Sequence, residues 1–241
     1  VMMRIARVNP IEVAPLDLIP QVALNVAYGS YPVFEYALLK IHTDDGTVGL
    51  GEAAPDPVVT GETQAGVMAA LEGFAPLVAG RDPFDIAAIM AEAETLAPQY
   101  PAARAALDMA LYDLMGKALG VSLYKLLGGR VRDGMPLYPV IPLDAPQVMA
   151  ERAVGFVQAG YRVLKLKVGT DPVKDEARVA AVWEAVKGIG QRETRPRPTK
   201  LRLDVNQGWG DAATALGALK RLARFDLEWV EQPVAAHDLD A

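Results

Sequence analysis

The stretch YRVLKLKVG, residues 161–169, decides the fold because it places two amines inside an apolar run. Its β-prone residues end at Gly169 and predict a short strand. Strand side chains alternate between two faces, so Lys165 and Lys167 point the same way. A run this apolar is usually buried on both faces, as in a parallel sheet. Buried ammonium groups repel each other, so carboxylates are expected opposite them; an edge strand with one solvated face is the alternative.

Two later stretches supply the carboxylates. Residues 201–209 form a short run that carries Asp204 and Asn206 on one face. Residues 227–233 bring Glu231 to the end of a further strand, which a proline then stops. For either carboxylate taken alone, a salt bridge toward a helix is the alternative. Together with the two lysines, they indicate one charged site.

Helical patterns over residues 172–187 and 211–224 separate these three strands. Strand, helix, strand, helix, strand at this spacing predicts βαβ units and a parallel sheet. Functional groups at the carboxyl ends of consecutive parallel strands are typical of a (β/α) barrel. Carboxylates are hard oxygen ligands that suit Mg²⁺, which keeps open positions for substrate oxygens.

Three motifs in this order and spacing, Lys165-Leu-Lys167, Asp204-Val-Asn206 and Glu231-Gln-Pro233, resemble the enolase superfamily. More narrowly, they are similar to its muconate lactonizing enzyme subgroup, in the mandelate racemase/muconate lactonizing enzyme family, which carries a KxK motif on the second barrel strand. The resemblance covers the whole chain. It implies an α/β protein with an α+β capping domain over residues 1–130. Residues 131–241 would then be the N-terminal half of a (β/α)7β-type barrel.

That barrel needs four more strands, and the sequence stops just after the fourth. We therefore expect the sequence to represent part of a longer chain. The resemblance places a third metal ligand and an opposing catalytic lysine after Ala241. His42 and His237 do not replace them, because one lies in the expected cap and the other trails the last motif.

The composition of the chain limits the classes of protein to which it can belong. The 241 residues are 51% hydrophobic, enough to bury a sizeable core in one or two domains. A net charge of −6 argues against a nucleic-acid partner. The chain has no cysteine, no apolar run of transmembrane length and no signal-peptide pattern at its start. We predict a cytoplasmic homo-oligomer that acts on a small carboxylate rather than on nucleic acid or membrane.

The first 52 residues read as strands over 4–13, 35–42 and 47–52, with a hairpin turn at 44–46. Two loops, residues 18–33 and 53–60, match by resemblance the family's substrate-specificity loops. Tyr28 and Tyr31 in the first loop are candidate substrate contacts, and ordinary surface loops are the alternative.

Amphipathic helices are predicted over residues 63–77, 83–96 and 101–119. Asp82 is placed as the N-cap of the second helix. Asp108 and Asp113 lie on different faces of the third helix and are interpreted as structural or solvated. The barrel is predicted to begin with a strand over 136–141 and a helix over 146–159. The arginine- and proline-rich residues 188–200 read as an exposed loop, with an anion-binding patch as the alternative.

The resemblance implies a Mg²⁺-dependent enzyme, with Mn²⁺ as an alternative ion, that removes a proton alpha to a carboxylate and forms an enolate intermediate. Asp204 and Glu231 would be metal ligands. Lys167 would be the base, and Lys165 would steady the substrate carboxylate. Asn206 and Gln232 would orient groups around the metal.

The expected activity is racemisation or epimerisation of an amino-acid derivative, or cycloisomerisation of a muconate-type acid. A dehydratase similar to o-succinylbenzoate synthase is a further alternative. A non-catalytic scaffold or binding protein with the same fold is another, although unpaired buried charges are costly to keep in a scaffold.

Overall fold

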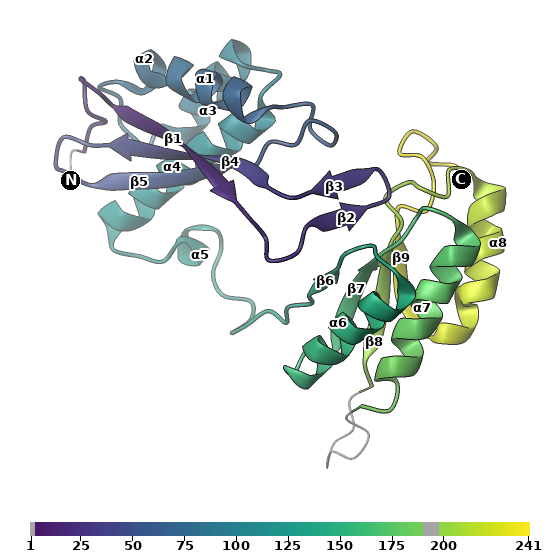
Figure 1. Ribbon diagram of the computed structural model, residues 1–241. Coiled ribbons are helices and arrows are strands. Elements are labelled where there is room, and N and C mark those ends of the chain that lie inside the picture. Colours follow the sequence, from purple (N-terminus) through teal and green to yellow (C-terminus); the bar gives the residue numbers. More distant parts are fainter. Residues whose placement is uncertain (1–2, 190–197) are drawn as a thin grey trace. The chain divides into compact units, whose positions relative to one another are not determined.

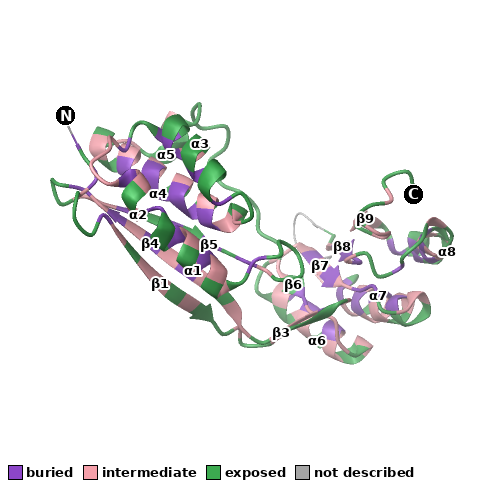
Figure 2. Cartoon of the chain, turned by 90° about the horizontal axis from the view of Figure 1, so that it is seen from above, coloured by how far each residue is buried: buried purple, intermediate pink, exposed green. Residues whose placement is uncertain are grey.

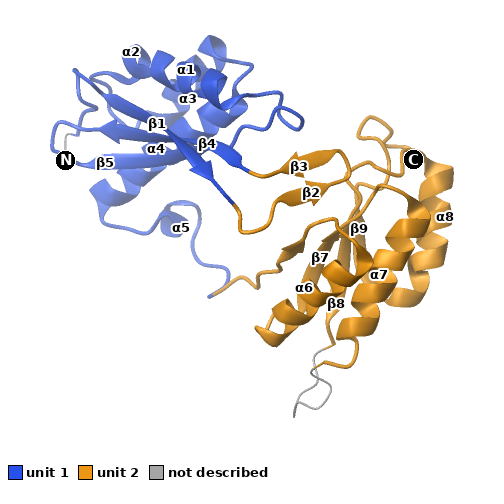
Figure 3. Cartoon of the chain, viewed as in Figure 1, with its two compact units in different colours: residues 1–19, 33–133 blue, residues 20–32, 134–241 orange. Residues whose placement is uncertain are grey.

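The computed structural model describes residues 3–189 and 198–241, and the chain divides into two compact units. Unit 1 comprises Val1–Ile19 and Val33–Asp133, and unit 2 comprises Pro20–Pro32 and Gly134–Ala241 (Figure 3). Unit 2 thus takes a short piece from the N-terminal part of the chain. No helix among the described residues is long and apolar enough to cross a membrane.

Unit 1 is built on an antiparallel sheet of β1 (Ile11–Leu18), β4 (Phe34–His42) and β5 (Val48–Ala53), in the order β1-β4-β5. The hairpin turn between β4 and β5 lies where the sequence predicts it. The prediction of a first strand over residues 4–13 was wrong. Asn9 adopts a left-handed φ of 49°, which breaks the extended chain, so Ile5 makes only an isolated bridge with Thr43.

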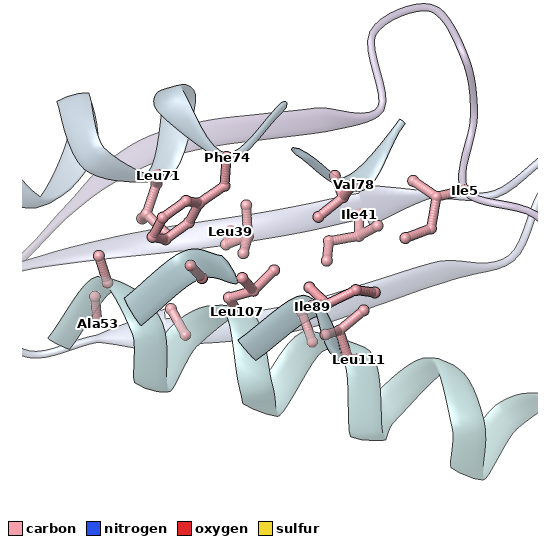
Figure 4. Packing of buried hydrophobic residues seen from close by; sticks show 14 of the residues in the cluster. Ile5, Leu39, Ile41, Ala53, Leu71, Phe74, Val78, Ile89, Leu107 and Leu111 are labelled. Atoms are coloured by element: carbon pink, nitrogen blue, oxygen red, sulfur yellow. The ribbon is translucent and has the colours of Figure 1, made fainter. Parts of the chain in front are cut away.

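Helices cover this sheet: α1 (Gln64–Gly73), α2 (Ala75–Val78), α3 (Ile86–Leu96) and α4 (Pro101–Leu119), followed by the short α5 (Leu123–Leu126). Apolar side chains of α1, α3 and α4 meet those of β4, with Leu39, Ile41, Phe74 and Leu107 fully or almost fully buried (Figure 4). Figure 2 shows buried residues, coloured purple, along α4, where Ala106, Leu107 and Leu111 are among the buried positions.

Two carboxylates of this unit have structural roles. Asp82 is not the N-cap of α3, which begins later, after Asp85; it accepts a hydrogen bond from the amide of Phe84 and so closes a turn. Asp113 accepts hydrogen bonds from the amide of Leu50 and the amine of Lys117, which ties α4 to β5. The structural interpretation of Asp113 is therefore confirmed.

Unit 2 contains a parallel sheet in the order β6-β7-β8-β9, formed by β6 (Val140–Ile141), β7 (Val163–Lys167), β8 (Lys200–Asp204) and β9 (Leu227–Glu231). The connecting helices are α6 (Pro146–Gln158), α7 (Pro172–Val186) and α8 (Ala212–Leu222), which continues as a short 3₁₀ turn, η1 (Ala223–Phe225). Figure 1 shows these helices along one face of the sheet. Leu164, Leu166 and Leu203 point toward them and are fully buried.

Two predictions for unit 2 need correction. The strand predicted over 136–141 is reduced to β6, because Pro136 and Pro139 have no amide hydrogen to donate to a ladder. The segment predicted as a loop over 18–33 contains a hairpin of β2 (Leu24–Val26) and β3 (Gly29–Tyr31). The loop predicted over 188–200 lies largely outside the described residues.

The β2–β3 hairpin is attached to the carboxyl end of the parallel sheet. The carbonyl of Asn25 accepts a hydrogen bond from the amide of Leu143, in the loop after β6. Val26 is buried, although its strand has only three residues. These contacts are the reason that residues 20–32 group with unit 2.

Candidate functional site

The candidate site lies at the carboxyl ends of β7, β8 and β9. In the parallel ladders Lys167 is paired with Asp204, and Asp204 is paired with Glu231. Because paired residues of neighbouring strands present their side chains to the same face, the register alone brings the three charged groups together. Lys165, two residues before Lys167, shares that face, as the alternation of the sequence predicts.

Four charged side chains meet at this face of the sheet. The Lys167 Nζ lies 2.8 Å from Asp204 Oδ2, and the Lys165 Nζ lies 2.9 Å from the same oxygen. The Lys165 Nζ also lies 2.6 Å from Glu231 Oε2. The two lysines thus point into a shared site, and the expectation of carboxylates opposite them holds.

Burial and charge act against each other here. The Asp204 side chain is 3% exposed, and those of Lys165 and Lys167 are 13% and 12% exposed. Burial alone raises the pKa of Asp204, but hydrogen bonds from Lys167 and Lys165 outweigh it and hold that pKa below its usual value. Burial likewise lowers the pKa of Lys165, and the bonds to Glu231 and Asp204 reverse this, so its pKa is raised.

Asn206 and Gln232 lie in tight turns directly after β8 and β9. Asn206 has a φ of 48°; its amide donates to Asp204 Oδ1 at 3.1 Å, and its side-chain oxygen accepts from Lys167 at 3.1 Å. Gln232 has a φ of 47° and its carbonyl accepts a hydrogen bond from the amide of Gln207. Asn206 therefore contacts the charged cluster directly, whereas Gln232 contacts Gln207 through its backbone carbonyl.

The sheet also carries residues that the sequence reasoning missed. The ring of Trp229 lies 5.5 Å from the Lys165 amine and 5.2 Å from the Arg202 guanidinium. Arg202 also lies over the ring of Tyr138, at 4.5 Å. Trp229 and Arg202 each precede a site carboxylate by two residues, so period-two alternation was the signal that could have found them.

Asp204 and Glu231 fit part of a divalent metal site. Both carboxylates contact the same ammonium nitrogen, that of Lys165, so their oxygens converge on one position that a cation occupies. Oxygen donors of this kind suit Mg²⁺. Within residues 3–189 and 198–241 no group of three or more acidic, histidine or cysteine side chains is placed to hold a metal.

Tyr28 and Tyr31 lie in the β2–β3 hairpin of the same unit. Their rings contact each other edge to face, with centroids 6.3 Å apart, and 41% of Tyr28 is exposed. Their predicted contact with a substrate stays a prediction.

Two family models match the chain. The model of the mandelate racemase / muconate lactonizing enzyme N-terminal domain matches residues 11–128, and the enolase C-terminal domain-like model matches residues 148–241. The first ends shortly before the part of unit 2 that begins at residue 134, and the second includes all four charged residues of the site.

Individual proteins are also similar to the chain. An N-succinyl-L-Arg/Lys racemase of Bacillus cereus is 37% identical over 90% of this chain and 56% of its own length. A chloromuconate cycloisomerase of Cupriavidus pinatubonensis is 33% identical over 85% of this chain and 54% of its own length. The crystal structure of a dipeptide epimerase from Enterococcus faecalis, complexed with Mg and the dipeptide L-Leu-L-Tyr, superposes with a TM-score of 0.89. Its sequence identity is 36%, covering 100% of this chain and 63% of that one. The chain thus spans less than two thirds of each of these proteins.

Proposed function

The chain belongs to the mandelate racemase/muconate lactonizing enzyme family of the enolase superfamily, and from this we propose that it carries part of a Mg²⁺-dependent racemase or epimerase site. The reaction is removal and return of the proton alpha to the carboxylate of an acylated amino acid, either an N-acyl amino acid or a dipeptide. The observation that carries the proposal is the meeting of two lysines and two carboxylates at the ends of β7, β8 and β9.

Proton removal from such a carbon needs more than a base. The carbon acid is far weaker than any protein side chain, so negative charge must be stabilised as it develops on the substrate carboxylate. Mg²⁺, when bound, supplies that positive charge, and Asp204 and Glu231 would hold it. The convergence of both carboxylates on one cation supports this assignment.

Lys167 is the proposed base on one face of the alpha carbon. Its amine lies beside Asp204, at the carboxyl end of β7. A substrate whose carboxylate binds next to Asp204 would therefore have its alpha carbon within reach of this amine. The side-chain oxygen of Asn206 fixes the direction of the Lys167 amine. Lys165 bridges the two carboxylates and places a second positive charge where the substrate carboxylate would bind. The side chain of Gln232 remains a candidate for orienting groups around the metal.

The amino-acid substrate class draws its support from two relatives. Their names specify an N-succinyl amino acid and a dipeptide, and both compounds contain an amino acid whose nitrogen is acylated. A muconate-type cycloisomerase is the second candidate, supported by the cycloisomerase relative. The tyrosines of the β2–β3 hairpin, Tyr28 and Tyr31, are proposed to contact the substrate, because the hairpin is attached to the carboxyl end of the barrel strands. Homo-oligomeric assembly, a cytoplasmic location and the use of Mn²⁺ stay predictions.

Deuterium exchange tests the proposal. The intact protein is incubated in D₂O with Mg²⁺ and with N-succinyl amino acids, dipeptides or muconate, and the alpha proton is followed by NMR. We expect exchange and inversion with at least one acylated amino acid, and loss of both when Mg²⁺ is chelated. Turnover of muconate without exchange of any amino-acid derivative would select the cycloisomerase. Absence of reaction with every carboxylate would favour a non-catalytic protein.

A further inference from the structure

A buried carboxylate outside the charged site gathers hydrogen-bond donors from two loops. Asp175, in the first turn of α7, is 0% exposed. Its Oδ2 accepts hydrogen bonds from the amide of Gly169 at 2.9 Å and from the indole of Trp209 at 3.0 Å. Gly169 follows β7 by two residues, and Trp209 lies in the loop after β8. The strands that carry Lys167 and Asp204 are thus tied to one side chain.

Arg178 extends this connection to a third loop. Its Nη1 donates to Asp175 Oδ1 at 2.7 Å and to Thr170 Oγ1 at 2.9 Å. Its Nε donates to the carbonyl of Asp144, in the loop after β6, at 2.9 Å. The Asp175–Arg178 pair therefore contacts all three loops that follow β6, β7 and β8 at the carboxyl edge of the sheet.

The loops so joined also touch through their backbones. A Cβ atom added to Gly169 would lie 2.0 Å from the carbonyl oxygen of Val205, and one added to Gly208 would lie 1.8 Å from the carbonyl oxygen of Gly169. The amide of Val168 donates to the carbonyl of Asp204 at 3.0 Å. Lys167 directly precedes Val168, and Asp204 directly precedes Val205. A displacement of either loop must therefore also displace Lys167 or Asp204.

The hydrogen-bonding groups around Asp175 indicate that this side chain holds the loops together and does not only add to the overall stability of the fold. The Gly169 amide, the Trp209 indole and the Arg178 guanidinium all donate to it, and a carboxylate accepts at both oxygens without presenting an N–H of its own. An apolar residue at this helical position would leave the indole and the Gly169 amide unsatisfied, and an asparagine would turn an N–H toward at least one donor. The guanidinium of Arg178 supplies the charge that offsets the burial of the carboxylate.

We infer that the Asp175–Arg178 pair is a positioning element, which keeps the ends of β7 and β8 in the register that sets Lys167 beside Asp204. The expected effect of the pair on catalysis rests on the proposed function, whereas its effect on the placement of Lys167 beside Asp204 does not. Outer contacts that orient metal ligands typically change affinity or activity by about 10- to 100-fold when they are removed.

The test compares Asp175→Asn with Val179→Ala in the intact protein. Val179 lies one turn further along α7, is fully buried in the apolar core and has no hydrogen-bonding group, so its truncation destabilises the same helix without removing a hydrogen bond to the loops. We expect Asp175→Asn to lower kcat for alpha-proton exchange and the Mg²⁺ affinity roughly 10- to 100-fold. Val179→Ala, which removes only apolar packing, should keep kcat and Mg²⁺ affinity close to their wild-type values. Equal losses in the two variants would overturn the inference, as would an unaffected Asp175→Asn.

A milder variant covers the case in which Asp175→Asn does not fold. Trp209→Phe removes one hydrogen-bond donor to Asp175 and keeps an aromatic ring. The indole N–H signal that disappears from the NMR spectrum of this variant is thereby assigned to Trp209 in the wild-type spectrum. We expect a smaller decrease of kcat and of Mg²⁺ affinity, again with no counterpart in Val179→Ala. A Trp209→Phe protein with wild-type kcat and Mg²⁺ affinity would contradict the inference.

Amide exchange separates this inference from the proposed function. If the wild-type protein neither binds Mg²⁺ nor exchanges any substrate, the proposed function fails. The hydrogen-exchange rate of the Val168 amide, which bridges β7 to Asp204, still reports the geometry. Faster exchange at Val168 in Trp209→Phe or Asp175→Asn, but not in Val179→Ala, supports the positioning element; unchanged protection refutes it.

Discussion

Lys167 and Asp204 face each other across the β7–β8 ladder, with the amine nitrogen 2.8 Å from the carboxylate oxygen. Asp204 also accepts a hydrogen bond from Lys165, so this carboxylate is shared by two ammonium groups. In this arrangement Lys167 is a hydrogen-bond donor. It can act as a base only after its contact with Asp204 is exchanged for a contact with a substrate.

Replacement of Lys167 by alanine should strongly slow proton exchange of one epimer and leave the fold intact. Asp204 keeps Lys165 as a partner in this variant, so no buried carboxylate is left unpaired. A general base typically contributes about 10²- to 10⁴-fold to the rate, and we expect a loss in that range. Alpha-deuterium exchange measures it, with the exposed Lys174→Ala in α7 as the control. Each epimer is assayed separately, because Lys167 serves only one face of the alpha carbon; a Lys167→Ala protein that keeps more than a tenth of the wild-type exchange rate with both epimers would exclude Lys167 as the base.

Lys165→Met should bind Mg²⁺ more tightly than the wild-type protein while it turns over substrate more slowly. The Lys165 ammonium lies between Asp204 and Glu231, where it contacts the oxygens that we propose as metal ligands. At a few ångströms, two like charges repel by several kcal/mol even at an effective dielectric constant of about 20, so removing one favours the other. Allowing for relaxation, we expect roughly a tenfold gain in affinity, measured by calorimetry.

Weaker Mg²⁺ binding by Lys165→Met would show the opposite role for the lysine. Lys165 would then organise the two carboxylates for the metal rather than compete with it. Lys174→Ala again serves as the control, because it removes a positive charge at an exposed position of α7 and should leave Mg²⁺ affinity unchanged.

Short-range patterns predicted which charged residues meet at one face of the parallel sheet. Period-two alternation placed Lys165 and Lys167 on one face, and the spacing of Asp204 and Glu231 put both carboxylates at strand ends that the sheet brings together. These features depend on local geometry that a strand imposes on any sequence. The parallel order of the four strands followed from the alternation of strands and helices.

Features that depend on contacts between residues far apart in the sequence could not be predicted from such patterns. Asp175 reads from the sequence as an ordinary acidic residue in the first turn of a helix, and only the packed loops reveal its burial. The left-handed backbone of Asn9 shortens the first strand, and the Asn9-Pro10 dipeptide was a turn signal that the strand prediction passed over. The hairpin within residues 18–33 has strands of only three residues each, too short for a periodic pattern.

Two aspartates that cap helices of unit 2 should make stability depend on pH. The Asp171 carboxylate accepts hydrogen bonds from the amides of Lys174 and Val173, and the first of these does most to lower its pKa. The amide of Thr214, followed by its hydroxyl, likewise lowers the pKa of Asp211. A carboxyl whose pKa is lower in the folded state adds stability above its unfolded pKa. That stability is lost as the pH falls through the folded pKa.

Asparagine at these two positions isolates the effect. Asn still caps a helix but does not titrate, so Asp171→Asn and Asp211→Asn should each be less stable than the wild type at pH 7. The difference should shrink on acidification below the usual Asp pKa of about 3.9. Denaturant unfolding at a series of pH values measures it. A difference that stays constant from neutral to acidic pH would show that neither carboxylate titrates differently in the folded protein.

Alanine at Gly169 should damage the site, whereas alanine at Gly160 should not. Both glycines have a positive φ, 108° and 103°, so a side chain at either position strains the backbone by about 1–3 kcal/mol. A Cβ at Gly160 meets nothing within 4 Å, but one at Gly169 would lie 2.0 Å from the carbonyl oxygen of Val205. The collision adds to the strain and separates the end of β7 from the end of β8. We therefore expect Gly169→Ala to lose more stability than Gly160→Ala and to lose Mg²⁺ affinity as well, while Gly160→Ala keeps wild-type affinity. Equal stability losses with unchanged Mg²⁺ binding in both variants would mean that the close approach of the two loops does not set the distance between Lys167 and Asp204.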